Sequence, residues 1–188
     1  MSLMLLGILN QQAAGGGAGA FDLLETVSLA TSASSVTFSG LDAYTDYKHL
    51  QIRAVARNTT TYDESVNLRL NADSGSNYAY HSLRGSSASV TSSAASSQTS
   101  ARISAFTGTD QGVNIYAFLV LDILDYANSS KNSTMRVFTG RGKSSGMEDV
   151  KLNSGLWMNT SAVTTIEIFP NSGNINTGSR FSLYGIKG

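Results

Sequence analysis

The sequence predicts an all-β fold, an antiparallel β-sandwich of jelly-roll type preceded by an extended N-terminal arm. Two observations lead to this expectation. About ten short segments of alternating or β-branched character follow one another at spacings of ~8–12 residues, with turn-forming residues between them. In addition, no segment shows the periodicity of an amphipathic helix of useful length, and glycine occurs 18 times against a single proline.

The composition limits the size of the protein and its classes of function. A chain of 188 residues is expected to form one domain, residues 21–188, with residues 1–20 as the arm. The 13 basic and 13 acidic side chains cancel without forming a basic stripe, so nucleic acid is not an expected partner. Because cysteine is absent, disulfides and thiolate metal sites are excluded, which suits synthesis in a reducing cytoplasm.

The arm consists of an apolar head, Met1–Asn10, and a glycine-rich tether, Gln11–Ala20. No Lys or Arg precedes the apolar run, so a secretory signal is not expected. The head either folds back onto its own domain or docks on a neighbouring subunit or partner. A flexible tether favours docking, because a locally packed segment does not need one. The predicted anchoring residues are Leu3, Leu5, Leu6, Ile8 and Leu9.

Strands are expected from the start of the domain onward. Leu24–Ala30 and Ser35–Ser39 are predicted to pair with each other. Tyr47–Arg57 alternates between apolar and polar side chains, as a half-buried strand does, and its predicted core residues are Leu50, Ile52, Ala54 and Ala56. Ser65–Asn71 and Tyr78–Leu83 flank a polar turn and are predicted to form a hairpin.

The run Gly85–Ala101 is rich in Ser, Ala and Thr, and few of its side chains are able to build a core. It fits either an exposed loop or weak edge strands, and the composition favours the loop. Arg102–Phe106 is then expected to be a short strand.

The segment Val113–Tyr126 is the longest apolar run and is predicted to be the central strand. Both of its alternating sets of side chains are largely apolar, as in a strand buried on two sides. It is too short and too acidic to cross a bilayer, so no membrane partner is expected. One face is assigned to the core, and the other to a second sheet or to another subunit. The predicted subunit-interface residues are Tyr116, Phe118 and Val120.

The remainder of the chain continues the pattern of strands and glycine-rich turns. A loop is expected over Gly140–Gly146. The predicted strands are Thr134–Arg141, Val150–Asn159, Val163–Phe169 and Phe181–Ile186.

Motifs that suggest catalysis or metal binding have simpler explanations. Gly142–Gly146 reads G-x-S-x-G, but a nucleophile elbow requires a helix after the serine, and a strand is expected here. The two histidines, His49 and His81, are not accompanied by cysteine and make a poor zinc site. Asp122 and Asp125 are expected on opposite faces of their strand, which argues against an acid–base pair. No enzymatic activity, catalytic residue or cofactor is predicted.

The polar stretch between two predicted strands raises the question of a calcium site. EF-hand spacing is absent and no glutamate closes the stretch. A turn whose side chains cap their own backbone explains the same residues, and no metal is assigned. The oxygen-bearing residues are Asn71, Asp73, Ser74, Ser76 and Asn77.

Four motifs occur in order along the chain: S-S-V-T-F-S-G-L-D-A-Y-T-D-Y-K-H-L-Q-I-R, L-R-L-N-A-D-S-G-S-N-Y-A-Y-H-S-L, L-D-I-L-D-Y-A-N-S-S-K-N and F-S-L-Y-G-I-K-G. With them the chain resembles a family of small virion structural proteins of tailed bacteriophages, common in phages of cyanobacteria and other aquatic hosts. The resemblance extends from Leu24 to Gly188 and includes the apolar head before the glycine tether. The family has no catalytic or binding motif that transfers residue by residue.

The resemblance implies a structural component displayed on the virion and made in the host cytoplasm. It implies a symmetric homo-oligomer, expected to be a trimer, that binds the major capsid protein or another virion component. The leading interpretation is a capsid decoration (cement) protein on the outer surface of the head. Its arm and subunit interfaces would add buried area across capsomer boundaries and so stabilise the shell.

The alternative is a tail or head fibre or appendage protein that binds a glycan or receptor on the host surface. This role requires a polar, aromatic-lined concavity, although buried tyrosines with hydroxyls at the rim account for most of the candidates. The candidates are Tyr44, Tyr47, Tyr62, Tyr78, Tyr80 and Trp157.

Overall fold

The computed structural model describes residues 19–188, so the predicted anchoring residues of the arm lie outside the described part of the chain. Within these residues, the regular structure consists of twelve β-strands and two short 3-10 helices. The elements are β1 (Phe21–Ser28), β2 (Val36–Ser39), η1 (Leu41–Ala43), β3 (His49–Ala56), β4 (Glu64–Leu70), β5 (Tyr78–Ser86), β6 (Ser89–Gln98), β7 (Ala101–Phe106), η2 (Thr109–Gln111), β8 (Ala117–Leu124), β9 (Ser133–Lys143), β10 (Gly146–Trp157), β11 (Thr165–Pro170) and β12 (Arg180–Ile186). The predicted all-β fold is confirmed.

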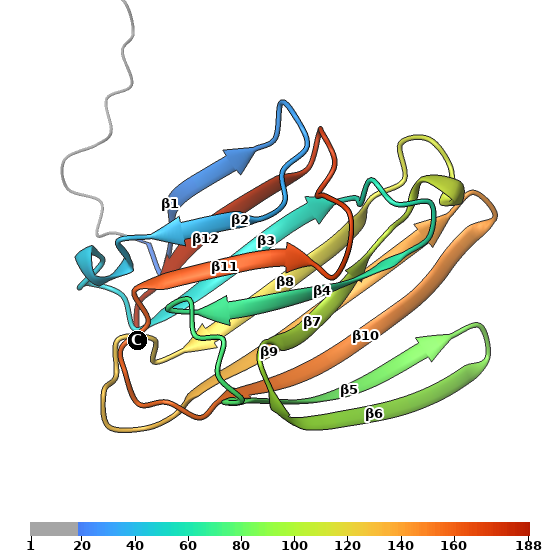
Figure 1. Ribbon diagram of the computed structural model, residues 1–188. Coiled ribbons are helices and arrows are strands. Elements are labelled where there is room, and N and C mark those ends of the chain that lie inside the picture. Colours follow the sequence, from blue (N-terminus) through green and yellow to red (C-terminus); the bar gives the residue numbers. More distant parts are fainter. Residues whose placement is uncertain (1–18) are drawn as a thin grey trace, which may run out of the picture.

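The strands form two antiparallel sheets that pack face to face (Figure 1). The larger sheet has the order β1-β12-β3-β8-β9-β10-β5-β6, and the smaller has the order β2-β11-β4-β7. Four strands of the larger sheet, β1-β12-β3-β8, and the four strands β2-β11-β4-β7 make up a jelly-roll arrangement. Taken in chain order, successive strands of these eight belong alternately to the two sheets, except that β4 and β7 both lie in the smaller sheet. The hairpins β9-β10 and β5-β6 extend the first of these sheets to eight strands.

Both predicted pairings in the first half of the domain are wrong. β1 and β2 lie in different sheets, where β1 pairs with β12 and β2 pairs with β11. β4 and β5 also lie in different sheets, since β4 pairs with β11 and β7, and β5 pairs with β10 and β6. In this topology a polar turn between consecutive strands is a corner at which the chain changes sheets, and turn composition alone does not distinguish a corner from a hairpin.

Two segments predicted as loops are largely strand. The Ser/Ala/Thr run contains the end of β5 and all of β6, so the loop interpretation is wrong and the edge-strand alternative is correct. β6 is exposed on both faces and is held by its backbone pairing with β5, which requires no core side chains. The predicted loop at Gly140–Gly146 is a tight turn, because β9 continues to Lys143 and β10 begins at Gly146.

The predicted central strand corresponds to β8, between β3 and β9 in the larger sheet. β8 is shorter than expected, because Asn114 adopts a left-handed φ of 64° and Val113 is 85% exposed before the strand begins. One face is buried in the core, as predicted, through Ala117, Leu119, Leu121 and Ile123. The other face lies on the outside of the sandwich, and no second sheet covers it in residues 19–188.

Candidate subunit interface

The outer face of the eight-stranded sheet carries a band of apolar side chains. The strand register places them in two adjacent rows that cross the sheet. The first row contains Val120, Phe138, Leu152 and Leu83. The second row contains Val55, Phe118, Val150 and Val90, with Gly140 and Gly85 between them. These eight apolar residues form the apolar band.

The apolar band is open to solvent. Val55 is 52% exposed, Leu152 is 55% exposed and Val90 is 71% exposed. Alternation along a strand places one set of side chains in the core and the next set on the opposite face, where polar residues are expected if the face is in water. Apolar residues here, contiguous across several strands, are therefore typical of a surface that is covered by another molecule.

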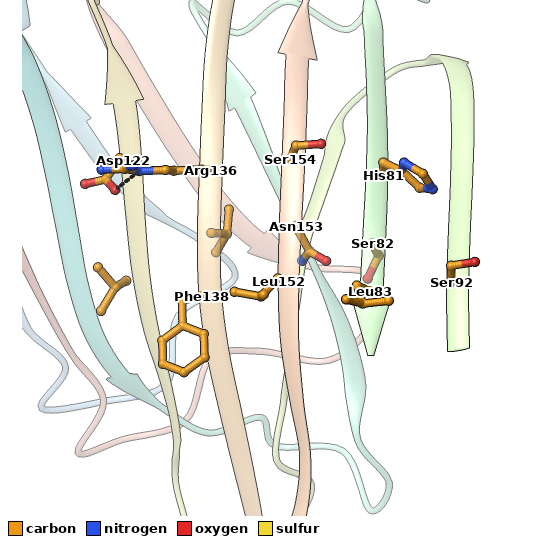
Figure 2. Close-up of a pocket in the computed structure, with 12 residues that line it drawn as sticks. His81, Ser82, Leu83, Ser92, Asp122, Arg136, Phe138, Leu152, Asn153 and Ser154 are labelled. Atoms are coloured by element: carbon orange, nitrogen blue, oxygen red, sulfur yellow. Dashed lines mark hydrogen bonds and ion pairs between the residues drawn. The ribbon is translucent and has the colours of Figure 1, made fainter. Parts of the chain in front are cut away.

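The first row forms the floor of a shallow groove with a volume of about 540 Å³ (Figure 2). Leu83, Phe138 and Leu152 lie along this groove, and a polar row that includes Asp122, Arg136, Ser154 and His81 borders it. The lining is mainly apolar, so the groove is suited to burying apolar surface from a partner.

The polar border is ordered by hydrogen bonds across three strands. Gln51 Nε2 donates to Asp122 Oδ1 over 2.7 Å, and Arg136 Nε donates to Asp122 Oδ2 over 2.7 Å. Arg53 Nε donates to Gln51 Oε1 over 2.7 Å. Asp122 is therefore engaged by an amide and a guanidinium, whereas Asp125 lies in the turn after β8 and pairs with Lys131. The two carboxylates do not share a site.

The structure brings two of the three predicted interface residues together. Phe118 and Val120 belong to the apolar band, and the rings of Phe118 and Phe138 are 5.3 Å apart between centroids. Tyr116 precedes β8, and its hydroxyl donates to the carbonyl oxygen of Thr177 over 3.1 Å. The other band residues were not identified from the sequence, although the alternation in Thr134–Arg141 already places Phe138 opposite the buried Val137.

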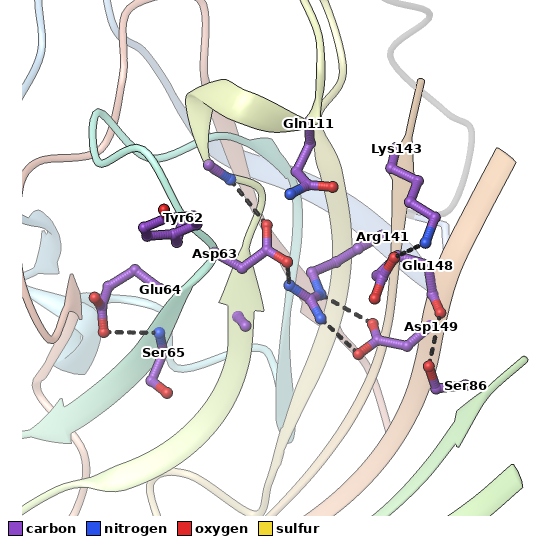
Figure 3. A network of polar contacts seen from close by, with 12 residues as sticks. Tyr62, Asp63, Glu64, Ser65, Ser86, Gln111, Arg141, Lys143, Glu148 and Asp149 are labelled. Carbon is purple, nitrogen blue, oxygen red and sulfur yellow. Dashed lines mark hydrogen bonds and ion pairs between the residues drawn. The ribbon is translucent and has the colours of Figure 1, made fainter. Parts of the chain in front are cut away.

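A second group of charged residues lies at one end of the sandwich (Figure 3). Arg141 donates from Nε to Asp149 Oδ1 over 2.9 Å and from Nη2 to Asp149 Oδ2 over 2.6 Å, and its third nitrogen pairs with Asp63. Arg84 adds a 2.6 Å bond to Asp149 Oδ2. Burial alone would raise the pKa of the Asp149 carboxyl, but the hydrogen bonds and charge of Arg141 outweigh it and hold this pKa below its usual value. The group ties β9 and β10 to the segment before β4.

The polar stretch between β4 and β5 is a self-capped turn. Asp73 Oδ1 accepts a hydrogen bond from the backbone N–H of Gly75, and Oδ2 accepts from Asn77 Nδ2 and from Trp157 Nε1. These bonds, that from Trp157 first, lower the pKa of Asp73. Asn71 Oδ1 accepts from the backbone N–H groups of Thr164 and Thr165. The side-chain oxygens of Asn71 and Asp73 are thus used by protein donors.

The other sequence motifs are separated in space or lack their required context. Gly142–Gly146 spans the end of β9, a turn and the start of β10, with no helix after the serine. His49 lies on β3, where Nδ1 accepts from the backbone N–H of Asp125, while His81 lies on β5 at the border of the groove. The two histidines are on strands that do not neighbour each other in the sheet.

The six aromatic residues considered for receptor binding do not gather in one concavity. Tyr78 and Trp157 are fully buried and stack with ring centroids 6.4 Å apart. Tyr44 and Tyr47 pack against the core, and Tyr62 is 74% exposed. None of the six lines the groove on the outer face.

Neither a family model nor a curated protein nor a solved structure matches this chain. In the part of the chain that the structure describes, no group of three or more His, Cys, Asp or Glu side chains is arranged to hold a metal ion. The same residues include no helix that is long and apolar enough to cross a membrane.

Proposed function

We propose that this protein is a structural component of a phage virion, and specifically a capsid decoration (cement) protein that assembles into a symmetric oligomer, expected to be a trimer, on the head shell. The observation that carries the proposal is the apolar band. It supplies a preformed surface for another subunit and requires no reaction. We infer the virion as the place where such a subunit acts from the family resemblance of the sequence.

The composition of the apolar band supports a protein–protein contact. Phe118 and Phe138 lie near its middle, and the charged side chains of Arg53 and Arg136 lie at its border. Aromatic residues at the centre of a contact and arginine are enriched in interfaces, and a polar rim is typical. The occupant of the band in this proposal is a second copy of the chain.

The arm supports the second contact that a cement protein needs. The apolar head Met1–Asn10 and the glycine tether precede β1, which is an edge strand of the larger sheet. In the proposal, the subunits associate through the apolar band, and the leucine-rich heads anchor the oligomer on the shell. In this arrangement the sandwich itself spans the boundary between capsomers.

The proposal is tested by adding purified full-length protein to expanded heads that lack it. The expected result is saturable binding in high copy number together with a higher melting temperature of the shell. A variant that lacks residues 2–18 should remain folded and no longer bind the heads. Retained binding by this variant would contradict the anchoring role of the arm.

The alternative proposal, a fibre or appendage protein, rests on the same resemblance. Failure of the full-length protein to bind expanded heads would favour it, and screening against host-surface glycans would follow. The dispersed positions of the six candidate aromatic residues give this alternative less support than the cement role.

A further inference from the structure

The two sheets end in four edge strands within residues 19–188, namely β1, β6, β2 and β7. An edge strand presents unpaired N–H and C=O groups, and proteins protect such edges with short strands, charges, bulges or covering groups. Three of the four edges show such protection. β2 has 4 residues, and β1 carries Asp22 and Glu25 with a register irregularity between Leu23 and Glu25. At β7, Asn153 Nδ2 donates to the carbonyl oxygen of Ile103 over 2.6 Å.

β6 shows none of these protections along most of its length. It has 10 residues, S-V-T-S-S-A-A-S-S-Q, with no charged residue and no proline. Ser89–Ala95 pair with β5 in an unbroken register, and the irregularity comes only after them. Every residue from Ser89 to Ala94 is exposed, and β6 forms the free rim of the larger sheet (Figure 1). A long, uncharged and regular edge of this kind is a template for another strand.

We propose that β6 pairs antiparallel with β6 of a second copy of this chain about a two-fold axis, so that the larger sheet continues from one subunit into the next. A two-fold axis perpendicular to a sheet makes identical strands antiparallel, which is the pairing that an isologous contact allows. The midpoint of the regular segment Ser89–Ala95 is Ser92, and the axis passes there. Thr91 then lies opposite Ser93 of the second copy, where cross-strand hydroxyl pairs stabilise a sheet.

The edge contact uses the backbone groups of β6, whereas the apolar band uses side chains of the outer face, and Val90 belongs to both surfaces. With the axis at Ser92, the outer faces of both copies lie on the same side of the joined sheet, and Val90 of each copy remains on that side. Both apolar bands are therefore left free for their own contact. The inference does not rest on a virion role, and it stands or falls separately from the proposed function.

A cysteine variant tests the position of the axis. The chain contains no cysteine, so Ser92→Cys introduces a single thiol at an exposed position. Directly opposed residues of an antiparallel pair have Cα atoms about 4.5–5.5 Å apart, within the range of a disulfide. Mild oxidation of the full-length variant is expected to give a covalent dimer in denaturing electrophoresis.

The matched control is Ser89→Cys on the same strand. In the proposed register Ser89 lies opposite Ala95, so two Ser89 positions are about 20 Å apart and no dimer is expected. Equal cross-linking of both variants, or cross-linking of neither, would overturn the proposal. Cross-linking of neither variant is also the result expected if residues 1–18 of the same chain pair with β6.

A charge-swap pair tests the contact without chemical cross-linking. Ser92→Lys places like charges opposite each other on the axis, and its native mass by analytical ultracentrifugation should fall to half that of the unmodified protein. Ser92→Glu should behave the same alone, and a mixture of the two should recover the original mass. An unchanged mass for each single variant would overturn the edge contact.

Discussion

Phe118 on β8 lies opposite Gly140 on β9, and its ring packs over the glycine in the space that a side chain at position 140 would occupy. A Cβ at Gly140 would stand only 2.8 Å from Cζ of Phe118. The missing side chain lets the ring lie toward Phe138 instead of projecting from the sheet. Gly140 and Gly85 thus leave two positions without a side chain in the second row of the apolar band.

Gly140→Ala is expected to displace the Phe118 ring. The ring lies on the open face and is able to move, so the expected cost is that of an off-rotamer side chain, about 0.5–1.5 kcal/mol in the free energy of unfolding, which urea denaturation will measure. Gly85→Ala is the matched control, because a Cβ there would contact only Val150 Cγ1 at 3.5 Å, an ordinary distance. Its effect should stay within about 0.5 kcal/mol. Equal effects of both substitutions would contradict the packing argument.

Val55→Glu is expected to weaken self-association through the apolar band. A carboxylate in an apolar contact is costly, but Arg180 lies directly opposite Val55 on β12 and offsets part of that cost. A rise of roughly tenfold in the dissociation constant, about 1.4 kcal/mol, is therefore expected. Val113→Glu makes the same change at a residue that is 85% exposed and outside the band. Sedimentation equilibrium should show weaker association for Val55→Glu alone. Unchanged association in both variants would remove the band as an interface.

Asp149→Asn is expected to destabilise the protein at pH 7 by about 3–5 kcal/mol, because it leaves the buried Arg141 without its main counter-charge. The pKa of Asp149 is lowered in the folded state, so its contribution to stability is present at neutral pH. That contribution is lost as the pH falls below the usual value of 3.8 and through the folded pKa.

Urea denaturation between pH 7 and pH 2 will measure this dependence. The unmodified protein should lose stability in the acid range more steeply than Asp149→Asn, since the variant has no carboxyl to protonate there. Asp46→Asn, at an exposed turn position, is the control and should follow the unmodified protein. An acid profile of Asp149→Asn identical to that of the unmodified protein would show that this pair does not control acid stability.

Tyr78→Phe is expected to lower the free energy of unfolding by about 1–3 kcal/mol, because the buried backbone N–H of Leu70 loses its hydroxyl partner, while the carbonyl oxygen keeps the N–H of Asp73. The hydroxyl of Tyr78 accepts from the N–H of Leu70 and donates to its carbonyl oxygen, which joins β5 of one sheet to β4 of the other. Tyr62→Phe, at a residue that is 74% exposed, should have no measurable effect.

Burial raises the pKa of Tyr78 to about 12, above its usual value of 10. The unfolded chain therefore ionises first, and the stability that Tyr78 contributes should be lost between about pH 10 and pH 12. Burial also raises the pKa of Tyr126, so ultraviolet difference titration should detect more than one tyrosine that ionises late. Tyr78→Phe should reduce the amplitude of the late step by one tyrosine, and an unchanged amplitude would contradict the assignment to Tyr78.

The sequence alone determined the fold class and the inward faces of several strands. Period-two alternation assigned Leu50, Ile52, Ala54 and Ala56 to the core, and all four are buried there. This assignment succeeds because the alternation of side chains is a local property of an extended backbone. The same local signal identified one face of β8 as the core face.

Tertiary structure alone decided which strands pair and which apolar face remains open. The pairing of Phe21 with Ile186 joins the two ends of the domain, and no local pattern encodes a contact of that separation. The Ser/Ala/Thr run is a strand because its backbone finds β5 as a partner, and composition does not report on that partner. Phe118 and Val120 are on the surface because no second layer covers their side of the sheet in the described chain, and coverage by a layer is a property of the whole fold.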